Sequence, residues 1–254
     1  TPNPKPQTPN PKPQTPMRHK ATNSSQFSVA IIDFKDMSKI AVVFYSTYGH
    51  VFKLAEALAE GARSAGAEVE IFRVKETLPE DVLTKMSALE VRAQWEKLPV
   101  ITPEDLKRFD GIAFGTPTRF GVMSAQMKTF IDSLGALWFS DALVGKFATL
   151  FTSTNSQHGG NEATILTSMV PLFHLGMAYV GLPYSFKGQC VENEIVGCSP
   201  YGSSTIAGSN GQRQPSQIEI DGAFYQGKHF VEIIKKKYTI SPVSAPADLA
   251  LLTK

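Results

Sequence analysis

The sequence predicts a doubly wound α/β fold, in which a five-stranded parallel sheet carries helices on both faces. Two observations lead to this prediction. Short runs of β-branched and aromatic residues alternate along the chain with longer segments of helical periodicity. The first run is continuously apolar, as expected of a strand that is covered on both faces. With 254 residues, 42% of them hydrophobic, the chain can form one domain of ordinary size with terminal tails.

The two ends of the chain are predicted to lie outside this domain. The first sixteen residues repeat TPNPKPQ, and their alternating prolines prevent helices and sheet ladders. We therefore interpret residues 1–36 as a proline-rich, extended or disordered N-terminal extension, 37–238 as the folded domain and 239–254 as a C-terminal tail. The extension has no long apolar centre of the kind that signal peptides have. No run of eighteen apolar residues predicts an integral membrane segment.

Five strands are expected within the domain, in the order 39–45, 67–74, 110–117, 145–154 and 177–183. The first strand leads into an amphipathic helix, and Gly66 is placed to stop it. A long charged connection, part of it helical, separates the second and third strands. Further helices are expected over residues 124–135, over 163–176 with a break near Pro171, and over 215–238. The regular alternation of strand and helix specifies the parallel sheet.

Three of the predicted strands end in polar loops that contain glycine, at residues 46–50, 116–121 and 153–160. In a doubly wound sheet, ligands bind outside the carboxyl ends of the strands, so these loops are expected to converge. The first loop precedes a helix N-terminus, whose free N–H groups and dipole attract a phosphate. It matches neither the P-loop nor the GxGxxG dinucleotide fingerprint. Taken alone, it fits a capped turn that binds nothing equally well.

Charge and cysteine content indicate which partners, metal sites and cellular location to expect. A formal net charge of +2 gives no reason to expect a nucleic-acid partner. The two cysteines, Cys190 and Cys198, lack CxxC spacing and flanking histidine pairs, so we expect neither a metal site nor a disulfide framework. Reduced thiols are typical of an intracellular protein, which predicts a cytoplasmic location.

Several segments closely resemble the WrbA-type NAD(P)H:quinone oxidoreductases, among them YSTYGH, GTPTRFG, FHLGM and PYGSSTIAG. The resemblance extends essentially from Met37 to Tyr238. It implies a flavodoxin-like fold, FMN as cofactor, NADH or NADPH as co-substrate and a homotetramer, with a dimer as the alternative. One departure occurs at NSQHGG, where family members often carry a shorter run of glycine and threonine.

The resemblance also assigns site residues. The implied FMN-binding residues are Ser46, Thr47, Tyr48, Gly49, His50, Val51, Thr116, Pro117, Thr118, Arg119, Phe120, Gly121, Ser153, Thr154, Asn155, Ser156, Gln157, His158, Gly159 and His174. The implied catalytic residues are Trp138, His174 and Phe120, which would form an aromatic slot for a flat quinone. By residue type alone, the tryptophan and the histidine are more often core or interface residues; the matching motifs favour the pocket.

The function implied by the resemblance is two-electron reduction of quinones to hydroquinones, by a ping-pong hydride relay through FMN that limits oxidative stress. Neighbouring chains of the tetramer would complete each pocket. Two alternatives remain open: a one-electron flavodoxin-type carrier, and a non-catalytic scaffold with the same fold. The near-neutral charge argues against the acidic docking face of a carrier, and the Gly- and Ser-rich stretch over residues 184–215 argues against it further.

Overall fold

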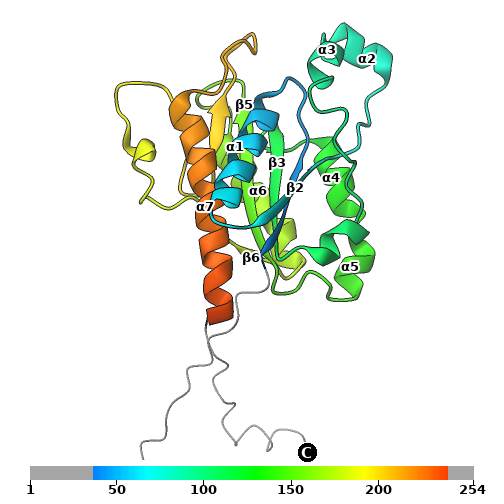
Figure 1. The fold of residues 1–254 in the computed structure, drawn as a ribbon. Helices are drawn as coiled ribbons and strands as arrows, with labels where there is room; N and C mark the ends of the chain where they lie inside the picture. The colour runs from blue at the N-terminus through cyan, green and yellow to red at the C-terminus, as the bar shows by residue number, and fades with distance from the viewer. Residues whose placement is uncertain (1–36, 240–254) are drawn as a thin grey trace, which may run out of the picture. The chain divides into compact units, whose positions relative to one another are not determined.

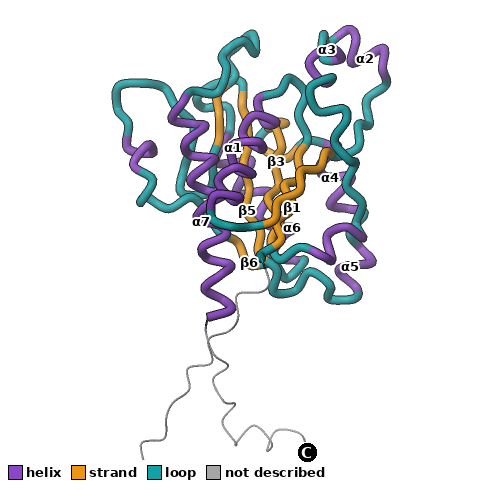
Figure 2. Tube along the Cα trace, viewed as in Figure 1, coloured by secondary structure: helices purple, strands orange, loops and turns teal. Residues whose placement is uncertain are grey.

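The structure is a computed structural model that describes residues 37–239. The predicted N-terminal extension and residues 240–254 of the predicted tail lie outside this range. Figures 1 and 2 show the described part as a central sheet with helices on two sides. Within it, no helix combines the length and the apolar character that crossing a membrane requires.

The sheet confirms the predicted doubly wound topology. Its parallel strands follow the order β2-β1-β3-β5-β6, so the direction of winding reverses beside β1. This is the flavodoxin-like arrangement, and it places the ligand edge at the carboxyl ends of β1 and β3. The bounds of these strands are β1 (Lys39–Phe44), β2 (Glu68–Arg73), β3 (Gly111–Arg119), β5 (Phe147–Thr154) and β6 (Ala178–Tyr179).

Two further short strands were not predicted. β4 (Val122–Met123) pairs antiparallel with the end of β3, and β7 (Ser204–Ile206) pairs in parallel with the end of β5. Because β6 pairs only with the start of β5, the last position of the sheet is shared by β6 and β7. The fifth strand predicted over 177–183 is therefore present as β6, but it ends at Tyr179. The chain leaves the sheet after β6, and the insertion that follows includes the 3-10 helix η2 (Lys187–Cys190).

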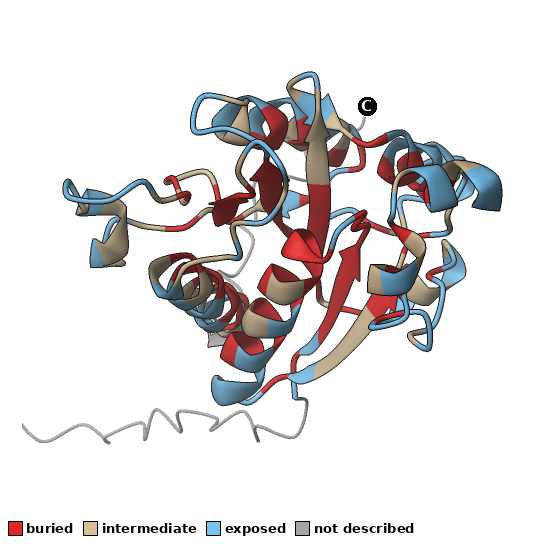
Figure 3. Cartoon of the chain, turned by 90° about the horizontal axis from the view of Figure 1, so that it is seen from above, coloured by how far each residue is buried: buried red, intermediate tan, exposed pale blue. Residues whose placement is uncertain are grey.

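The helices cover both faces of the sheet, as Figure 3 shows. Alternate residues of β1 point to opposite sides: Ala41 and Val43 belong to one apolar core, Val42 and Phe44 to the other. The first core includes residues of α4 and α6, and the second includes residues of α1 and α7. The bounds are α1 (His50–Ser64), α4 (Ala125–Asp132), α5 (Gly135–Phe139), α6 (Asn161–His174) and α7 (Gln217–Thr239).

Helix α6 runs through Pro171 without interruption, so the predicted break there was wrong. The proline lies in the last turn of the helix, and its missing N–H removes one backbone hydrogen bond there. Its own carbonyl still accepts the N–H of Leu175 at 3.1 Å. The helix therefore reaches from the ligand edge of the sheet to the opposite edge.

The connection between β2 and β3 contains α2 (Glu80–Lys85), α3 (Leu89–Arg92) and the 3-10 helix η1 (Glu104–Arg108). Trp95, which follows α3, is buried against Phe44 and Phe52, with ring centroids 6.3 and 5.3 Å away. This contact anchors the connection beside the N-terminal turn of α1.

The carboxylate of Glu76 contacts three other segments of the chain around this connection. It accepts hydrogen bonds from Tyr45 Oη at 3.0 Å and Gln126 Nε2 at 2.9 Å, and it pairs with the guanidinium of Arg92. Burial by itself raises the pKa of Glu76, but the N–H of Leu78, the Gln126 amide and Arg92 outweigh it. The pKa of this carboxyl therefore lies below its ordinary value.

This depressed pKa predicts an acid-sensitive contribution to stability. The ionised form of Glu76 is favoured in the folded state, so its contribution is complete above the unfolded-state pKa, near 4.3. It is lost as the pH falls through the lower, folded-state pKa. Urea unfolding at pH 7 and at pH 3 gives the free energy of unfolding at each pH. This free energy should fall less between the two pH values in Glu76→Gln than in the wild type. The exposed Glu80→Gln is the control, and equal acid losses in both variants would contradict the assignment.

Candidate functional site

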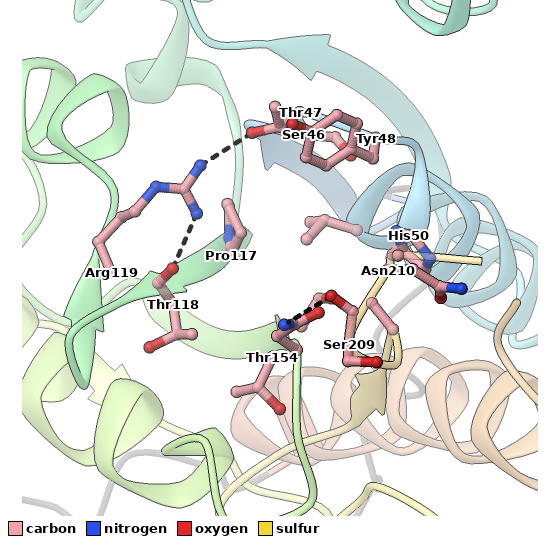
Figure 4. A pocket seen from close by; sticks show the side chains of 15 residues that line it. Ser46, Thr47, Tyr48, His50, Pro117, Thr118, Arg119, Thr154, Ser209 and Asn210 are labelled. Atoms are coloured by element: carbon pink, nitrogen blue, oxygen red, sulfur yellow. Dashed lines mark hydrogen bonds between the residues drawn. The ribbon is translucent and has the colours of Figure 1, made fainter. Parts of the chain in front are cut away.

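A pocket of about 410 Å³ lies at the carboxyl edge of the sheet, within the size range of small-molecule sites. Four segments surround it, and each consists of the end of β1, β3, β5 or β7 with the loop that follows (Figure 4). Eleven of the lining residues were predicted: Ser46, Thr47, Tyr48, His50, Val51, Pro117, Thr118, Arg119, Ser153, Thr154 and Asn155. The predicted convergence of the three loops is therefore a feature of the fold.

The first loop is shaped to bind an anion. Its hydroxyl at Ser46 accepts the N–H of Gly49 at 3.0 Å, and Gly49 adopts φ 91° as the N-cap of α1. An L-residue with a side chain would be strained in this left-handed conformation. The first turn of α1 contains no acidic residue. Its N–H groups and the positive end of the helix dipole therefore present an uncompensated site for a phosphate.

The second loop is a tight hairpin between β3 and β4. Phe120 and Gly121 at its tip have φ values of 55° and 82°, and the N–H of Gly121 donates to Thr118 Oγ1 at 3.1 Å. Next to the tip, Arg119 reaches across the pocket and donates to Thr47 Oγ1 at 3.0 Å (Figure 4). The side chain of Phe120 is fully exposed, and its positive φ marks local strain.

The third and fourth loops form the remaining wall. Asn155 Nδ2 donates to the carbonyl of Ser209 at 3.3 Å, which ties the two loops together. The fourth loop lines the pocket through Ala207, Ser209, Asn210 and Gly211, none of which was predicted. A partial signal was present in the sequence, since GSNG is a polar, glycine-containing segment like the other loops, but only two apolar residues, Ile206 and Ala207, precede it directly. It was missed because the three-residue strand β7 has no readable periodicity.

His50 connects the first and fourth loops from the side of α1. Its ring is buried, and its Nε2 lies 3.0 Å from the carbonyl oxygen of Arg213. A carbonyl oxygen only accepts, so Nε2 carries the proton in this contact. Burial lowers the pKa of His50, and the nearby Lys53 lowers it further. The neutral ring therefore acts as a structural donor.

Several predicted residues do not line the pocket. Most of them belong to the same loops or to the N-cap of α1: Gly49, Thr116, Phe120, Gly121, Ser156, Gln157, His158 and Gly159. Gln157 and His158 are exposed. Their segment is where the chain departs from the family pattern.

Within one chain, Trp138 and His174 are also separated from the pocket. His174 is the last residue of α6, about 20 Å along the helix from its start at the ligand edge. Next to it, Gly176 accepts the N–H of Gly145, just before β5 begins. Trp138 lies in α5, between the end of α4 and the start of β5. Both residues therefore lie near the amino edge of the sheet, so a single chain brings neither Trp138 to the predicted substrate pocket nor His174 to the predicted flavin site.

The donor groups of the pocket fit FMN. The first loop offers backbone N–H groups and hydroxyls for a phosphate, and the other loops offer backbone and side-chain polar groups for a ring and its ribityl chain. Over residues 37–239, no group of three or more His, Cys, Asp or Glu residues is placed to hold a metal ion.

The fold and this pocket together define a protein of the flavodoxin class. The chain belongs to the NADPH-dependent FMN reductase family, whose model matches residues 38–190. An NAD(P)H dehydrogenase (quinone) from Syntrophobacter fumaroxidans is 54% identical over 199 residues, which cover 78% of this chain and 98% of that protein. A second such dehydrogenase, from Methanosarcina acetivorans, is 55% identical over 205 residues, which cover 79% of this chain and 98% of that protein.

Solved structures of flavodoxin-like proteins are also similar to this chain. The flavodoxin-like, WrbA-like protein from Agrobacterium tumefaciens has a TM-score of 0.54 and 25% identity, and the match covers 78% of this chain and 98% of that one. An archaeal flavodoxin, with a TM-score of 0.51 and 18% identity, shares the fold. The resemblance to WrbA-type oxidoreductases is confirmed.

Proposed function

We propose that this chain is an NAD(P)H:quinone oxidoreductase that uses FMN to reduce quinones to hydroquinones by a ping-pong hydride relay. The observation that carries the proposal is the four-loop pocket, which is lined at one side by an α1 N-terminus without acidic residues. The quinone dehydrogenases that match over nearly their whole length support it. Bound FMN supplies the hydride chemistry between the nicotinamide and the quinone.

The chain's own residues bind and orient the flavin. The first turn of α1 and the hydroxyls of Ser46 and Thr47 hold the phosphate. Pro117 and Thr118 present a rigid edge to the ring. Arg119, which spans from the second loop to Thr47, adds positive charge beside the phosphate end of the pocket.

The substrate side of the pocket is completed by a second copy of the chain in a homotetramer or dimer. Helix α6 supports this, because Leu166, Val170 and Phe173 form an exposed apolar stripe at helical spacing. Trp138 and Phe139 are exposed as well. Assembly would cover these side chains and bring Trp138 and His174 of one copy to the flavin of another, where they and Phe120 would stack with a flat quinone.

The remaining parts of the proposal concern location and partners. Both cysteines are free thiols, which supports a reducing, cytoplasmic compartment. We expect no nucleic-acid partner. Small-molecule quinones and further copies of the same chain are the proposed partners.

One assay tests the activity against both alternatives. The purified protein is incubated with FMN, freed of excess flavin, and followed for oxidation of NADH or NADPH with and without benzoquinone. We expect a bound-flavin spectrum, quinone-dependent turnover and parallel double-reciprocal lines. Bound flavin without steady turnover would identify a one-electron carrier. An absence of flavin binding would instead identify a non-catalytic scaffold.

Trp138→Ala tests whether assembly completes the pocket. We expect quinone turnover to fall about tenfold or more, with an unchanged FMN dissociation constant, since the residue is outside the pocket of its own chain. Size-exclusion chromatography with light scattering then reports the oligomeric state. Tyr184→Ala, which removes an equally exposed aromatic ring from the insertion, is the control. Loss of flavin binding in Trp138→Ala alone would contradict the assignment.

A further inference from the structure

The fourth loop lines the pocket without belonging to a helix or strand, so something else must hold its shape. Its two ends meet through the N–H of Arg213, which donates to the carbonyl of Ala207 at 2.9 Å. Gly208 and Gly211 turn the chain with φ values of 79° and 71°. The loop is thus closed at Arg213, four residues before α7 begins at Gln217.

The side chain of Arg213 fixes this closure. Its guanidinium donates to the carbonyls of Ile206 at 2.7 Å and Ile195 at 2.9 Å, and it pairs with Glu219 at 2.9 Å. The first carbonyl belongs to β7 and the second to the insertion between β6 and β7. One planar cation therefore joins the insertion, the last strand and α7.

Glu219 is the fully buried counterpart of this cation. As the third residue of α7, it forms a capping box with Ser216: it accepts the N–H of Ser216 at 2.8 Å, and Ser216 Oγ accepts its N–H at 3.3 Å. Its carboxylate also accepts from Thr205 Oγ1 and from the N–H of Gly197, both at 2.8 Å. A helix cap requires neither of these contacts.

A fully buried carboxylate is costly unless every partner is present. Here the partners come from the insertion, β7, the end of the fourth loop and the start of α7. Their common position is directly behind the pocket wall. The backbone of Arg213 also connects this network to α1, because its carbonyl accepts the Nε2–H of His50 in the first turn of that helix. This turn forms the proposed phosphate end of the pocket.

We propose that Glu219 and Arg213 are positioning residues of the flavin site, which hold the fourth loop against α1 so that the pocket is formed before FMN binds. The inference rests on the proposed use of FMN. Preorganisation increases affinity because the ordering of the loop is completed during folding. Through Gly197 and Ile195, the same pair links the conformation of the insertion to flavin affinity.

Glu219→Gln tests the proposal, with Glu232→Gln as the matched control on an exposed position of the same helix. An amide in place of the carboxylate cannot accept from every N–H donor, and it removes the charge opposite Arg213. The dissociation constant of FMN for the apoprotein is measured by flavin fluorescence, well below the melting temperature. We expect it to rise about ten- to hundredfold in Glu219→Gln and less than twofold in Glu232→Gln.

Hydrogen exchange separates positioning from general stability. In the apoprotein, Glu219→Gln should accelerate exchange of the amides over residues 207–213, while those of β1 and β3 stay protected. Unchanged FMN affinity, or acceleration spread evenly over the domain, would overturn the proposal. If Glu219→Gln does not fold, Arg213→Lys is tested by the same two measurements. Lysine keeps the charge, but its single nitrogen cannot replace the two guanidinium nitrogens that contact Ile206, Ile195 and Glu219. Failure of the wild type to bind FMN would instead overturn the proposed function.

Discussion

Replacing Gly227 with alanine is expected to destabilise the domain severely. Helices α1 and α7 lie side by side (Figure 1), and a Cβ at this position would lie 2.0 Å from the carbonyl oxygen of Leu58 and 3.0 Å from the N of Ala62. The opposing Gly61 is equally close to α7, with Phe224 O 1.8 Å from its ideal Cβ. The neighbouring atoms are backbone, so no side-chain rotation can relieve the overlap.

The two helices must therefore move apart, which loosens the apolar packing on this face of the sheet. Overpacking in a core costs about 1–3 kcal/mol, and we expect about 3 kcal/mol or more here because backbone is involved. Urea unfolding of the apoprotein, followed by far-UV circular dichroism, gives the free energy of unfolding. Gly135→Ala is the matched control, because its Cβ would meet nothing within 4 Å. Equal stabilities of the two variants would refute the close contact.

Replacing Ser46 with aspartate is expected to abolish tight FMN binding while leaving the fold intact. Aspartate can still accept the N–H of Gly49, which Ser46 Oγ accepts at 3.0 Å. It also places a negative charge at the phosphate end of the pocket, where the first turn of α1 has none. Repulsion of roughly 3 kcal/mol between this carboxylate and the phosphate would weaken FMN binding about 100-fold.

Ser46→Asn is the control, since asparagine has the same shape and accepts the same hydrogen bond without a charge. Titration of each apoprotein with FMN and with riboflavin, which lacks the phosphate, isolates the electrostatic effect. The aspartate and asparagine variants should differ strongly for FMN and by less than about threefold for riboflavin. A similar penalty for both flavins would show that the phosphate binds elsewhere.

Much of the fold and the first three loops could be predicted from the sequence because their signals are local. The apolar run at Lys39–Phe44 and the helix that starts at His50 adjoin in the chain. The alternation of strand and helix then constrains the topology, because parallel strands need crossover helices. The loops that follow β1, β3 and β5 must meet at one edge of the sheet. Their convergence around a single pocket follows from these rules alone.

Contacts between residues far apart in the sequence were decided only by the tertiary structure. The last sheet position is divided between β6 and β7, and the long insertion between them gave no periodic signal. The fourth wall of the pocket depends on Glu219, whose partners at Gly197 and Thr205 lie 22 and 14 residues away.

Motif matches also could not show where Trp138 and His174 lie, since His174 ends a helix that leads away from the ligand edge and Trp138 lies in the short helix that follows α4. The sequence by itself determined the doubly wound parallel fold, the glycine-containing loop before the first helix and the flavin family, because each is encoded in contiguous residues. Tertiary structure decided how the pocket is closed and which side chains it excludes, because buried charges and short strands are stabilised by partners that no local pattern specifies.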